Sequence, residues 1–330
     1  MPSEALRLEG PLLQYDPDGR ALARARSLGR DGALAELERS GLRGRGGAYF
    51  PTARKWRAAL DQRRPLALVV NAEEGEPGVF KDRAILGLRP PTFVEGLAIA
   101  SLVVEPELTV IFINGEARAA RRSLEDALGA ALGLLPIPRI LPGGGGYVLG
   151  EESTMLNAIE GRKPVPRLRP PYPVESGLFG MPTVINNVET IAVLALVFGE
   201  GAEPFAATGH PDAPGTRLVS LSGRVQRPGI YEVPTGTTIA EVVELGGGPL
   251  AGEVTAVLCG GPSGGFLPPS ELGRPLLPGP IHPTGAIMGA GGLIVLDSTS
   301  DVRGAALAMA AYNADESCGK CTPCREGTPR

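Results

Sequence analysis

Short apolar runs alternate with amphipathic stretches through the N-terminal two-thirds of the chain. Residues 66–70 and 108–113 are runs of aliphatic and aromatic side chains without polar alternation, which is typical of buried strands. Residues 20–40, 93–104 and 118–132 place apolar side chains at helical spacing, and a glycine interrupts the first of these stretches. Strands that alternate with helices in this way predict an α/β domain with a largely parallel sheet.

The pattern changes after residues 210–215, whose sequence HPDAPG has the composition of a linker. Beyond it we predict two paired strands joined by a turn, a short helix that begins at a threonine cap, and a returning strand, at residues 216–222, 229–233, 238–245 and 254–259. This order is typical of a small β-grasp-like unit of α+β type. From Asp301 a further helical stretch runs into a cluster of cysteines.

The composition is that of a globular chain of 330 residues, 43% apolar, which is long enough for two or three domains. A net charge of −4 argues against a nucleic-acid-binding protein, which would normally show a basic face. No apolar run approaches the roughly 18 residues that a membrane span needs, and residues 1–5 lack the basic and apolar regions of a secretory signal. We therefore expect a cytoplasmic protein without direct membrane insertion.

Three of the four cysteines, Cys318, Cys321 and Cys324, fall within seven residues. In a cytoplasmic chain the spacing C-x-x-C-x-x-C indicates metal or iron–sulfur ligation rather than disulfides. Zinc is a weaker interpretation, because structural zinc takes four ligands. Cys259 stands apart in an apolar segment, and we interpret it as a small buried side chain.

A glycine-rich segment leads into a helix that we predict to begin near Thr52. Gly44, Gly46 and Gly47 allow the backbone to approach a ligand and to turn its N–H groups toward an anion, at a point where a helix N-terminus adds partial positive charge. Lys55, one of only four lysines, follows in the first helical turn and suits a point contact to a phosphate. The segment predicts a phosphate cradle, with a simple structural turn as the alternative; it is not the fingerprint G-x-G-x-x-G.

Polar side chains also gather directly after the first predicted strand, in residues 71–82. In open α/β sheets, ligands bind beyond the carboxyl ends of strands. Asn71, Glu73 and Glu74 are therefore candidates to bond a polar ring edge or a ribose, with a solvated acidic loop as the alternative.

Two more segments carry polar pairs. Glycines in residues 143–150 precede Glu151 and Glu152, which stand where a helix is expected to begin and where carboxylates are favourable in any case. Adjacent Asn186 and Asn187 lie in an otherwise apolar stretch. Buried amides need partners, so either a ligand or a backbone loop must satisfy them.

Taken together, these segments resemble the FMN-binding flavin subunits of respiratory complex I and the matching subunits of soluble hydrogenases and formate dehydrogenases. The family's hallmarks GRGGAGFPTGLKW, NADEGEPG-FKDR, GAYICGEE and TTVNNVET stand here, in the same order, as GRGGAYFPTARKW, NAEEGEPGVFKDR, GGYVLGEES and PTVINNVET. The C-terminal ESCGKCTPCREG is similar to the family's cluster-binding motif. The resemblance covers roughly residues 38–327, which is nearly the whole chain.

The resemblance implies a Rossmann-like α/β domain that binds FMN and NADH in residues 1–210, a ubiquitin-like β-grasp domain of the soluble-ligand-binding kind in 215–298, and the start of a helical iron–sulfur domain in 299–330. It implies an NADH:acceptor oxidoreductase subunit that transfers a hydride from NADH to FMN and passes electrons to iron–sulfur clusters. The implied partners are NADH, a thioredoxin-like [2Fe-2S] subunit and other electron-transfer subunits of a larger complex, which would hold the chain in the cytoplasm or peripherally at the inner membrane.

The resemblance also assigns roles to single residues, with Glu74 as the catalytic candidate. The implied FMN contacts are Gly44, Arg45, Gly46, Gly47, Lys55, Asn71, Glu73, Glu74, Tyr147, Gly150, Glu151, Asn186 and Asn187. The implied NADH contacts are Phe50, Glu76, Glu152 and Tyr172. The implied ligands of a [4Fe-4S] cluster are Cys318, Cys321 and Cys324.

The sequence departs from the family's pattern in three respects. Tyr49 and Ala53 replace glycines, and the ring of Tyr49 would either crowd the site or stack on a ligand. Ala58 and Tyr172 stand where the family places phenylalanines that sandwich the nucleotide; tyrosine can still stack, and alanine cannot. The chain stops six residues after Cys324, so the fourth thiolate that a [4Fe-4S] cluster normally takes is missing. A shortened chain, a ligand from a partner and loss of the cluster are the alternatives.

Two rival functions follow from these departures. One is a flavin-binding electron-transfer subunit that no longer takes NADH, which the alanine at position 58 and the tyrosine at position 49 suggest. The other is a non-catalytic scaffold that docks partner subunits through its β-grasp domain. The intact motifs at residues 44–55 and 71–82 weigh against a scaffold, which has no need of them.

Overall fold

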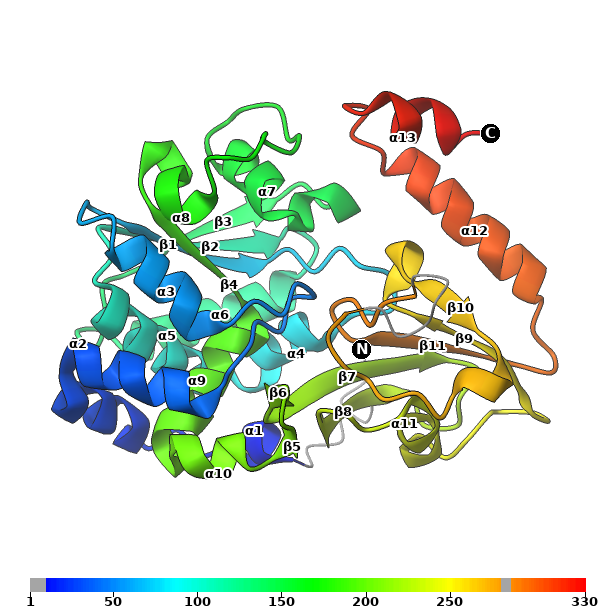
Figure 1. Ribbon diagram of the computed structural model, residues 1–330, viewed down its shortest axis with the longest axis horizontal. Helices are drawn as coiled ribbons and strands as arrows, with labels where there is room; N and C mark the ends of the chain where they lie inside the picture. The colour runs from blue at the N-terminus through cyan, green and yellow to red at the C-terminus, as the bar shows by residue number, and fades with distance from the viewer. Residues whose placement is uncertain (1–9, 280–285) are drawn as a thin grey trace. The chain divides into compact units, whose positions relative to one another are not determined.

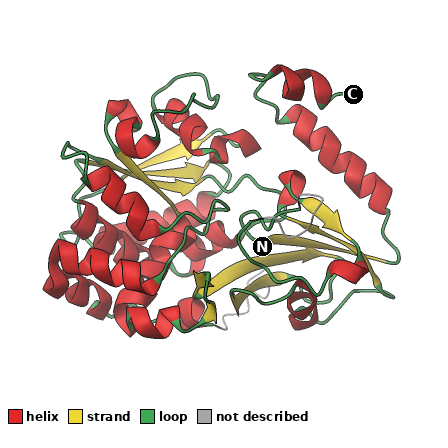
Figure 2. Cartoon of the chain, viewed as in Figure 1, coloured by secondary structure: helices red, strands yellow, loops and turns green. Residues whose placement is uncertain are grey.

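The computed structural model describes residues 10–279 and 286–330, which fold as two compact units (Figures 1 and 2). The first unit contains Glu76–Lys81, Thr208–Arg330 and the N-terminal segment up to Gln14, and the second contains Tyr15–Gly75 and Asp82–Ala207. Residues 1–5, on which the expectation about a secretory signal rests, lie outside the described residues. The domain boundaries predicted from the sequence stay predictions.

The second unit is built on a four-stranded parallel sheet in the order β3-β2-β1-β4. Its strands are β1 (Ala67–Ala72), β2 (Leu108–Asn114), β3 (Arg139–Gly143) and β4 (Thr183–Asn187). The central strands β1 and β2 are buried along almost their whole length, which explains why their sequences are apolar runs rather than alternating patterns. The strands predicted at 66–70 and 108–113 are confirmed to within two residues.

Helices supply the rest of the second unit: α2 (Arg20–Ser40), α3 (Thr52–Leu60), α4 (Lys81–Leu88), α5 (Pro90–Val104), α6 (Arg118–Ala130), α7 (Glu152–Ile159), α8 (Pro173–Ser176), α9 (Val188–Glu200) and α10 (Ala202–Ala206). The helices predicted at 20–40, 93–104 and 118–132 are confirmed as α2, α5 and α6. Helix α2 is kinked at Gly29, whose φ of 63° and ψ of 179° are not helical. Helices α5 and α9 are apolar on all sides because both are buried.

The core of the second unit lies on both faces of the sheet, with α7 and α8 on one side and α5 and α9 on the other (Figure 1). On one face Val69, Val110 and Ile185 pack with Met155 and Leu156 of α7. On the other face α5 and α9 approach so closely that a Cβ on Gly96 of α5 would lie 1.9 Å from a carbonyl oxygen of α9. Only glycine permits this crossing.

The first unit contains a five-stranded mixed sheet in the order β10-β9-β11-β7-β8. Its strands are β7 (Thr216–Gly223), β8 (Gly229–Pro234), β9 (Val254–Cys259), β10 (Gly265–Leu267) and β11 (Gly292–Asp297). Strand β11 runs parallel to β7 and antiparallel to β9. Helix α11 (Ile239–Leu245) begins with a capping box in which the side chains of Thr238 and Glu241 each bond the other residue's backbone N–H. The strands and the capped helix predicted between residues 216 and 259 are confirmed.

Residues 210–215 are not an open linker, contrary to the prediction from their composition. They take part in a small antiparallel ribbon of β5 (Gly209–His210) and β6 (Ala213–Pro214), and both residues of β6 are buried. Proline and glycine set the tight turns here, and the composition of such turns is the same as that of a linker.

The C-terminal part of the first unit is helical, as predicted from Asp301 onward. Helix α12 (Val302–Asp315) begins where an oxygen of Asp301 accepts a hydrogen bond of 2.9 Å from Gly304 N, and α13 (Thr322–Gly327) follows it.

The short helical elements of the two units are α1 (Pro11–Gln14), η2 (Tyr147–Gly150), η3 (Leu178–Gly180), η4 (Gly261–Ser263) and η5 (Pro269–Glu271). In the described part of the chain, no helix combines the length and the apolar character that crossing a membrane requires.

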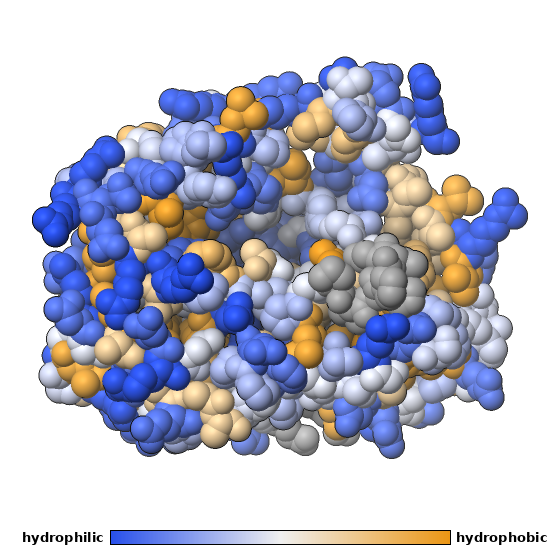
Figure 3. All heavy atoms as spheres, viewed as in Figure 1, coloured by the Kyte–Doolittle hydropathy of each residue, from blue (hydrophilic) through white to orange (hydrophobic). Residues whose placement is uncertain are grey.

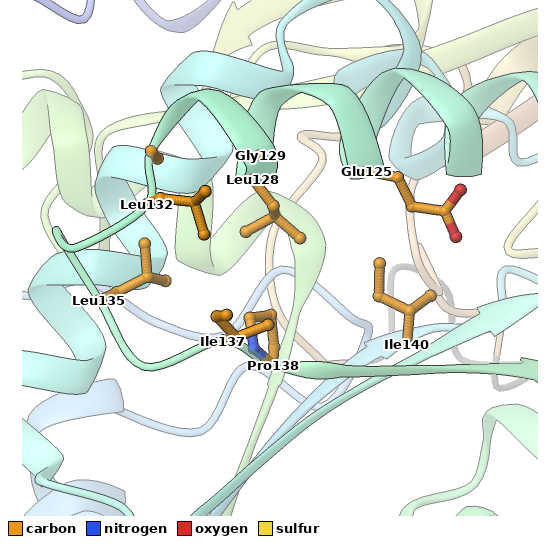
Figure 4. Close-up of a pocket in the computed structure, with 9 residues that line it drawn as sticks. Glu125, Leu128, Gly129, Leu132, Leu135, Ile137, Pro138 and Ile140 are labelled. Carbon is orange, nitrogen blue, oxygen red and sulfur yellow. The ribbon is translucent and has the colours of Figure 1, made fainter.

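Apolar side chains are scattered over the surface shown in Figure 3, where hydrophilic residues predominate. One apolar hollow of about 240 Å³ lies between α6 and β3 in the second unit (Figure 4). Leu128 and Leu132 line it from α6 and the turn that follows, and Ile137 and Ile140 line it from the approach to β3 and from the strand.

Candidate functional site

The carboxyl ends of the four parallel strands meet at one edge of the second unit's sheet. The register sets Asn71 of β1 beside Asn187 of β4, and Asn114 of β2 beside Gly143 of β3. This is the edge at which α/β sheets bind ligands. Most of the residues predicted to form the site stand on or next to it.

The glycine-rich segment forms a tight loop that closes on itself and leads into α3. The N–H of Gly44 donates to the carbonyl of Phe50 at 3.0 Å. Gly47 has a φ of 106°, which side-chain-bearing residues rarely adopt. A Cβ on Gly46 would stand 3.1 Å from Cβ of Asn187, so this loop is closely seated against the end of β4.

Two side chains of this loop, Arg45 and Tyr49, are buried. Arg45 is fully buried, and its N–H donates to Oγ1 of Thr190 on α9 at 2.9 Å. Tyr49 is buried with a φ of 53°. Its effect on a bound ligand, crowding or stacking, stays a prediction.

Glu73 is completely buried just beyond the end of β1, and within the described residues neither of its carboxylate oxygens has a hydrogen-bond partner. Burial raises the pKa of Glu73 to about 7, and the nearby N–H of Gly145 offsets this only in part. A Cβ on Gly143 would come 2.0 Å from Oε2, so the glycine leaves the room that the carboxyl group occupies. A buried, unpartnered acid at the ligand-binding edge of a sheet is typical of a functional site.

Glu74, the predicted catalytic residue, holds the start of α4. Its carboxylate accepts hydrogen bonds from the N–H of Asp82 at 2.5 Å, from the N–H of Arg83 at 3.1 Å and from Nε of Arg83 at 2.7 Å. Burial and the negative charge of Asp82 raise the pKa of Glu74 to about 7 against the opposing effect of Arg83. The structure therefore shows a positioning role for this residue, and its catalytic role stays a prediction.

Asn71 ties the end of β1 to the turn that carries Tyr147. Its Nδ2 donates to the carbonyl of Gly150 at 2.8 Å, and its Oδ1 accepts from the N–H of Glu73 at 3.2 Å. Tyr147 and Gly150 open and close the short η2 turn. Asn71 thus fixes the relative position of the two loops that the sequence places at the site.

Glu151 and Glu152 stand at the N-terminus of α7. Oε2 of Glu151 accepts hydrogen bonds from the backbone N–H groups and the hydroxyls of Ser153 and Thr154, and these bonds outweigh burial and lower the pKa of Glu151. One guanidinium nitrogen of Arg169 lies 2.6 Å from Glu151 Oε1 and 2.9 Å from Glu152 Oε1. Sequence reasoning missed Arg169, because nothing local links it to Glu151, 18 positions away.

The amide side chains of Asn186 and Asn187 bond other groups of the protein. A bound ligand is therefore not needed to satisfy the amide atoms that make these bonds. Oδ1 of Asn186 accepts from Nε1 of Trp56 at 2.9 Å. Oδ1 of Asn187 caps α9 through the N–H of Glu189, and its Nδ2 donates to Asp82 at 2.5 Å. Their predicted contacts to an FMN phosphate stay predictions.

A pocket of about 300 Å³ brings together the two positions that the resemblance assigns to nucleotide stacking, 58 and 172, and the predicted NADH contact Phe50. Phe50, Ala58 and Tyr172 line it together with Lys55 and Glu152. The side chains of Phe50 and Tyr172 are 47% and 51% exposed. Exposed aromatic rings around an apolar hollow suit the faces of a planar heterocycle.

Lys55 reaches this pocket from the first turn of α3. Its Nζ donates to the carbonyl of Ile185 at 2.9 Å. Burial lowers the pKa of Lys55, and the charge of Glu152 counteracts that effect. A lysine that is buried this far and holds one carbonyl has donors left for an anion.

Glu76 belongs to the first unit, whereas the other predicted NADH contacts belong to the second. Its Oε2 accepts from the N–H of Ala290 at 3.2 Å. The structure thus assigns Glu76 to a different unit from Phe50, Glu152 and Tyr172, and its contact with NADH stays a prediction.

The clustered cysteines lie in the stretch from the end of α12 into α13. Cys318 is half-buried, Cys321 and Cys324 are exposed, and Sγ of Cys324 lies 3.2 Å from Oγ of Ser317. Over residues 10–279 and 286–330, no three Cys, His, Asp or Glu side chains converge as a metal-binding set. The residues present do not fit a complete cluster site. Cys259 is buried in β9, and burial raises its pKa to about 12, so it is the inert side chain that its segment predicted.

Family models match three successive segments of the chain. The model of the Nuo51 FMN-binding domain matches residues 37–196, that of the SLBB domain matches 218–267, and that of the NADH-ubiquinone oxidoreductase-F iron-sulfur binding region matches 304–330. An F subunit of the NADH-quinone oxidoreductase of Rhizobium meliloti is 39% identical over 97% of this chain and 80% of its own length. The F subunit of the Aquifex aeolicus enzyme is 37% identical over 95% of this chain and 76% of its own length.

A solved structure of an NAD+-reducing [NiFe]-hydrogenase in the H2-reduced state superposes with a TM-score of 0.86 at 38% identity, over 97% of this chain. This chain spans 57% of the hydrogenase chain, somewhat more than half of it. The predicted fold class is confirmed. The predicted oxidoreductase class, the FMN-binding domain and the iron–sulfur region are confirmed at the level of the family. The chain belongs to the family of NADH-quinone oxidoreductase F subunits.

Proposed function

We propose that this chain binds FMN at the carboxyl edge of the second unit's sheet and oxidises NADH there. The observation that carries the proposal is Glu73, a carboxyl group buried at that edge, for which the N–H of Gly145 is the nearby donor among the described residues and neither oxygen has a hydrogen bond of good geometry. In the neighbouring loop, added Cβ atoms at Gly144, Gly145 and Gly150 would meet open space. Buried polar groups are rarely left without partners, so an orphaned acid beside open glycines supports a bound polar ligand.

The residues present fit FMN. The loop of Gly44, Gly46 and Gly47 together with Lys55 would hold the phosphate, since backbone N–H groups before a helix and a compact ammonium both favour anions. Glu73 and Asn71 would face the polar parts of the cofactor. Bound FMN would supply the hydride-accepting ring, and the protein contributes position and charge.

The pocket that Phe50, Ala58 and Tyr172 line, here called the stacking pocket, would hold the dinucleotide. The rings of Phe50 and Tyr172 would bind a planar base. Glu73, with its pKa near 7, can hold or release a proton at the pH at which the enzyme works. Glu74 would orient α4 and the loop after β1 rather than touch the reacting atoms.

The relatives' names support membership of a multi-subunit NADH-quinone oxidoreductase or an NAD+-linked hydrogenase. A thioredoxin-like [2Fe-2S] subunit as electron acceptor, and peripheral attachment to a membrane through the complex, belong to this proposal. So do the domain boundaries at 210, 215–298 and 299–330. No electron-transfer step is assigned to the three thiols, since among the described residues they do not form a complete ligand set.

The absorption spectrum of the purified protein before and after addition of NADH tests the proposal. We expect one FMN per chain, released by heat and identified by chromatography, and bleaching of the flavin bands by NADH. FAD in place of FMN, or no flavin after reconstitution with FMN, would contradict the binding site. Bleaching by dithionite but not by NADH would instead favour the electron-transfer subunit, the candidate that Ala58 suggests.

Replacing Ala58 with phenylalanine is expected to tighten NADH binding. The new ring would add an aromatic face worth about 0.5–1.5 kcal/mol to the pocket that Phe50 and Tyr172 line, up to about tenfold in affinity. Titration of flavin bleaching with NADH measures the change. The same substitution at Ala119, an exposed position on α6, is the matched control and should have no effect. An unchanged affinity for Ala58→Phe would show that position 58 does not line the nucleotide site.

Anaerobic reconstitution of the isolated chain with iron and sulfide is expected to give no stable cubane. Cys318, Cys321 and Cys324 supply three thiolates, and the exposed position of two of them leaves a cluster open to water and oxygen. Iron counting and low-temperature EPR after reduction measure the outcome. A robust signal with about four irons per chain would contradict the expectation. Cys259→Ser would then test whether the buried thiol is the missing ligand.

A further inference from the structure

Beside the stacking pocket stands a solvent-exposed cation, Arg54, that pairs with no carboxylate among the described residues. Arg54 lies on the first turn of α3, exposed to solvent, with its guanidinium carbon 5.7 Å from the centroid of the Phe50 ring. Within residues 10–279 and 286–330 this stacking contact is the interaction that Arg54 makes, and no carboxylate pairs with it. Because the ring of Phe50 lines the pocket, the charge of Arg54 stands at the pocket's rim.

The other charges around the pocket are already engaged. Glu152, the acidic side chain that lines the pocket, lies 2.9 Å from Arg169, which also pairs with Glu151. The ammonium of Lys55 donates to the carbonyl of Ile185. A carboxylate that is held by a guanidinium repels a second anion less than a free one does. The balance at this pocket is therefore positive. Since the proposed function assigns Lys55 to the FMN phosphate, Arg54 is the exposed cation that remains for a second anion among the described residues.

Position 54 also carries a different residue in the family's motif, where GFPTGLKW has a leucine and this chain has an arginine. Ala58 lies four residues later, so the two positions share one face of α3. On that face the chain has lost the family's aromatic ring and gained a cation. A guanidinium stacked on an aromatic ring keeps its N–H edge free, and that edge matches a phosphate in geometry and charge.

We propose that Arg54 recognises a phosphate on the adenosine ribose, so that this chain takes the 2′-phosphorylated dinucleotide, NADPH, at the same pocket as NADH. The inference rests on the proposed function, since it assumes that the pocket holds the adenosine end of a dinucleotide. In other dinucleotide-binding sites, an arginine near the ribose accommodates a 2′-phosphate in the same way. Phe50 then has two roles: it stacks on the base, and it holds the guanidinium in place.

Fragments of the dinucleotide isolate the recognition of the ribose phosphate from the rest of binding. Calorimetric binding of 2′,5′-ADP and of 5′-AMP to the full chain measures the contribution of the ribose phosphate without any turnover. We expect 2′,5′-ADP to bind about fivefold more tightly, in the range of an exposed ion pair. The preference should shrink at high salt, because exposed charges are screened.

Variants at and beside position 54 identify the residue responsible. Arg54→Gln should bring the two affinities to within about twofold of each other, whereas Arg54→Lys keeps the charge and should retain part of the preference. Arg57→Gln is the matched control, because Arg57 lies on the same helix and pairs with Glu38 at 2.9 Å. It should leave the preference unchanged.

Two results would overturn the inference: equal or weaker binding of 2′,5′-ADP by the unaltered chain, or a preference that survives Arg54→Gln. Steady-state bleaching of the flavin by NADPH and NADH separates this inference from the proposed function. Bleaching by NADH without bleaching by NADPH contradicts the inference alone. Failure of both to bleach an FMN that dithionite reduces contradicts the proposed NADH-oxidising activity.

Discussion

Gly46→Val is expected to lower the affinity for FMN by at least about a hundredfold, the scale of a steric clash in a tightly packed site. A Cβ at position 46 would already stand 3.1 Å from Cβ of Asn187, and the branched methyl groups of valine extend beyond it. Asn187 cannot yield easily, because its side chain caps α9 and bonds Asp82. The loop would have to lift away from β4, and its N–H groups would leave the anion site.

Reconstitution of the apoprotein with FMN, monitored by flavin fluorescence, measures this loss. Gly129→Val on α6 is the matched control, since an added Cβ there meets nothing within 4 Å. It should keep full affinity. If Gly46→Val binds FMN as tightly as the unaltered chain and has the same free energy of unfolding, the phosphate lies elsewhere than at this loop.

Local sequence signals predicted the elements of the fold well. The apolar runs of β1 and β2, the glycine break in α2 and the threonine cap of α11 each depend on residues close together in the chain. The segment 210–215 was misread because its glycine and prolines produce the same composition in a buried ribbon as in a linker. Composition alone does not report burial.

The site was predictable where motifs stand next to strands, and less so where partners come from afar. The sequence placed the loop after β1 at the carboxyl end of a strand, and the family resemblance joined the loop around Gly46 to the same site. The parallel register brings Asn71 of β1 beside Asn187 of β4, against which Gly46 packs. The sequence did not reveal that Trp56 bonds Asn186, since the two are 130 positions apart. Nor did the sequence show that the neighbouring acids Glu73 and Glu74 have different surroundings. In the fold Glu74 bonds Arg83, whereas neither oxygen of Glu73 has a well-formed hydrogen bond among the described residues.

Because Glu73 is a buried acid, we expect Glu73→Gln to change the free energy of unfolding in a pH-dependent way. Glu73 is buried without a partner among the described residues, so its ionised form is disfavoured and its pKa rises to about 7. The folded chain therefore keeps a proton that the unfolded chain releases near pH 4.5. Stability falls as the pH rises from the unfolded pKa to the folded one, and the loss is complete above it.

Replacing the acid with a neutral amide removes this penalty. We expect Glu73→Gln to stabilise the apoprotein by roughly 2–3 kcal/mol at pH 8, equivalent to roughly 5–10 °C in the melting temperature of the second unit. At pH 4.5 the gain should nearly vanish, because Glu73 is then largely protonated in the folded state and is losing its charge in the unfolded one as well. Under the proposed function, this penalty is the cost of leaving the carboxyl group available for FMN.

Urea unfolding of the apoprotein at pH 4.5 and pH 8, monitored by the fluorescence of Trp56, measures the effect. Trp56 is the single tryptophan and lies buried in α3, so it reports on the second unit. Glu36→Gln is the control of opposite sign: Glu36 is equally buried, but bonds from the N–H of Ala202 and from Arg39 outweigh burial and lower its pKa. Its replacement should destabilise the chain at pH 8, where the ionised acid holds these partners. If both variants lose stability at pH 8, Glu73 has partners in solution, and the open acid that supports the flavin site does not exist.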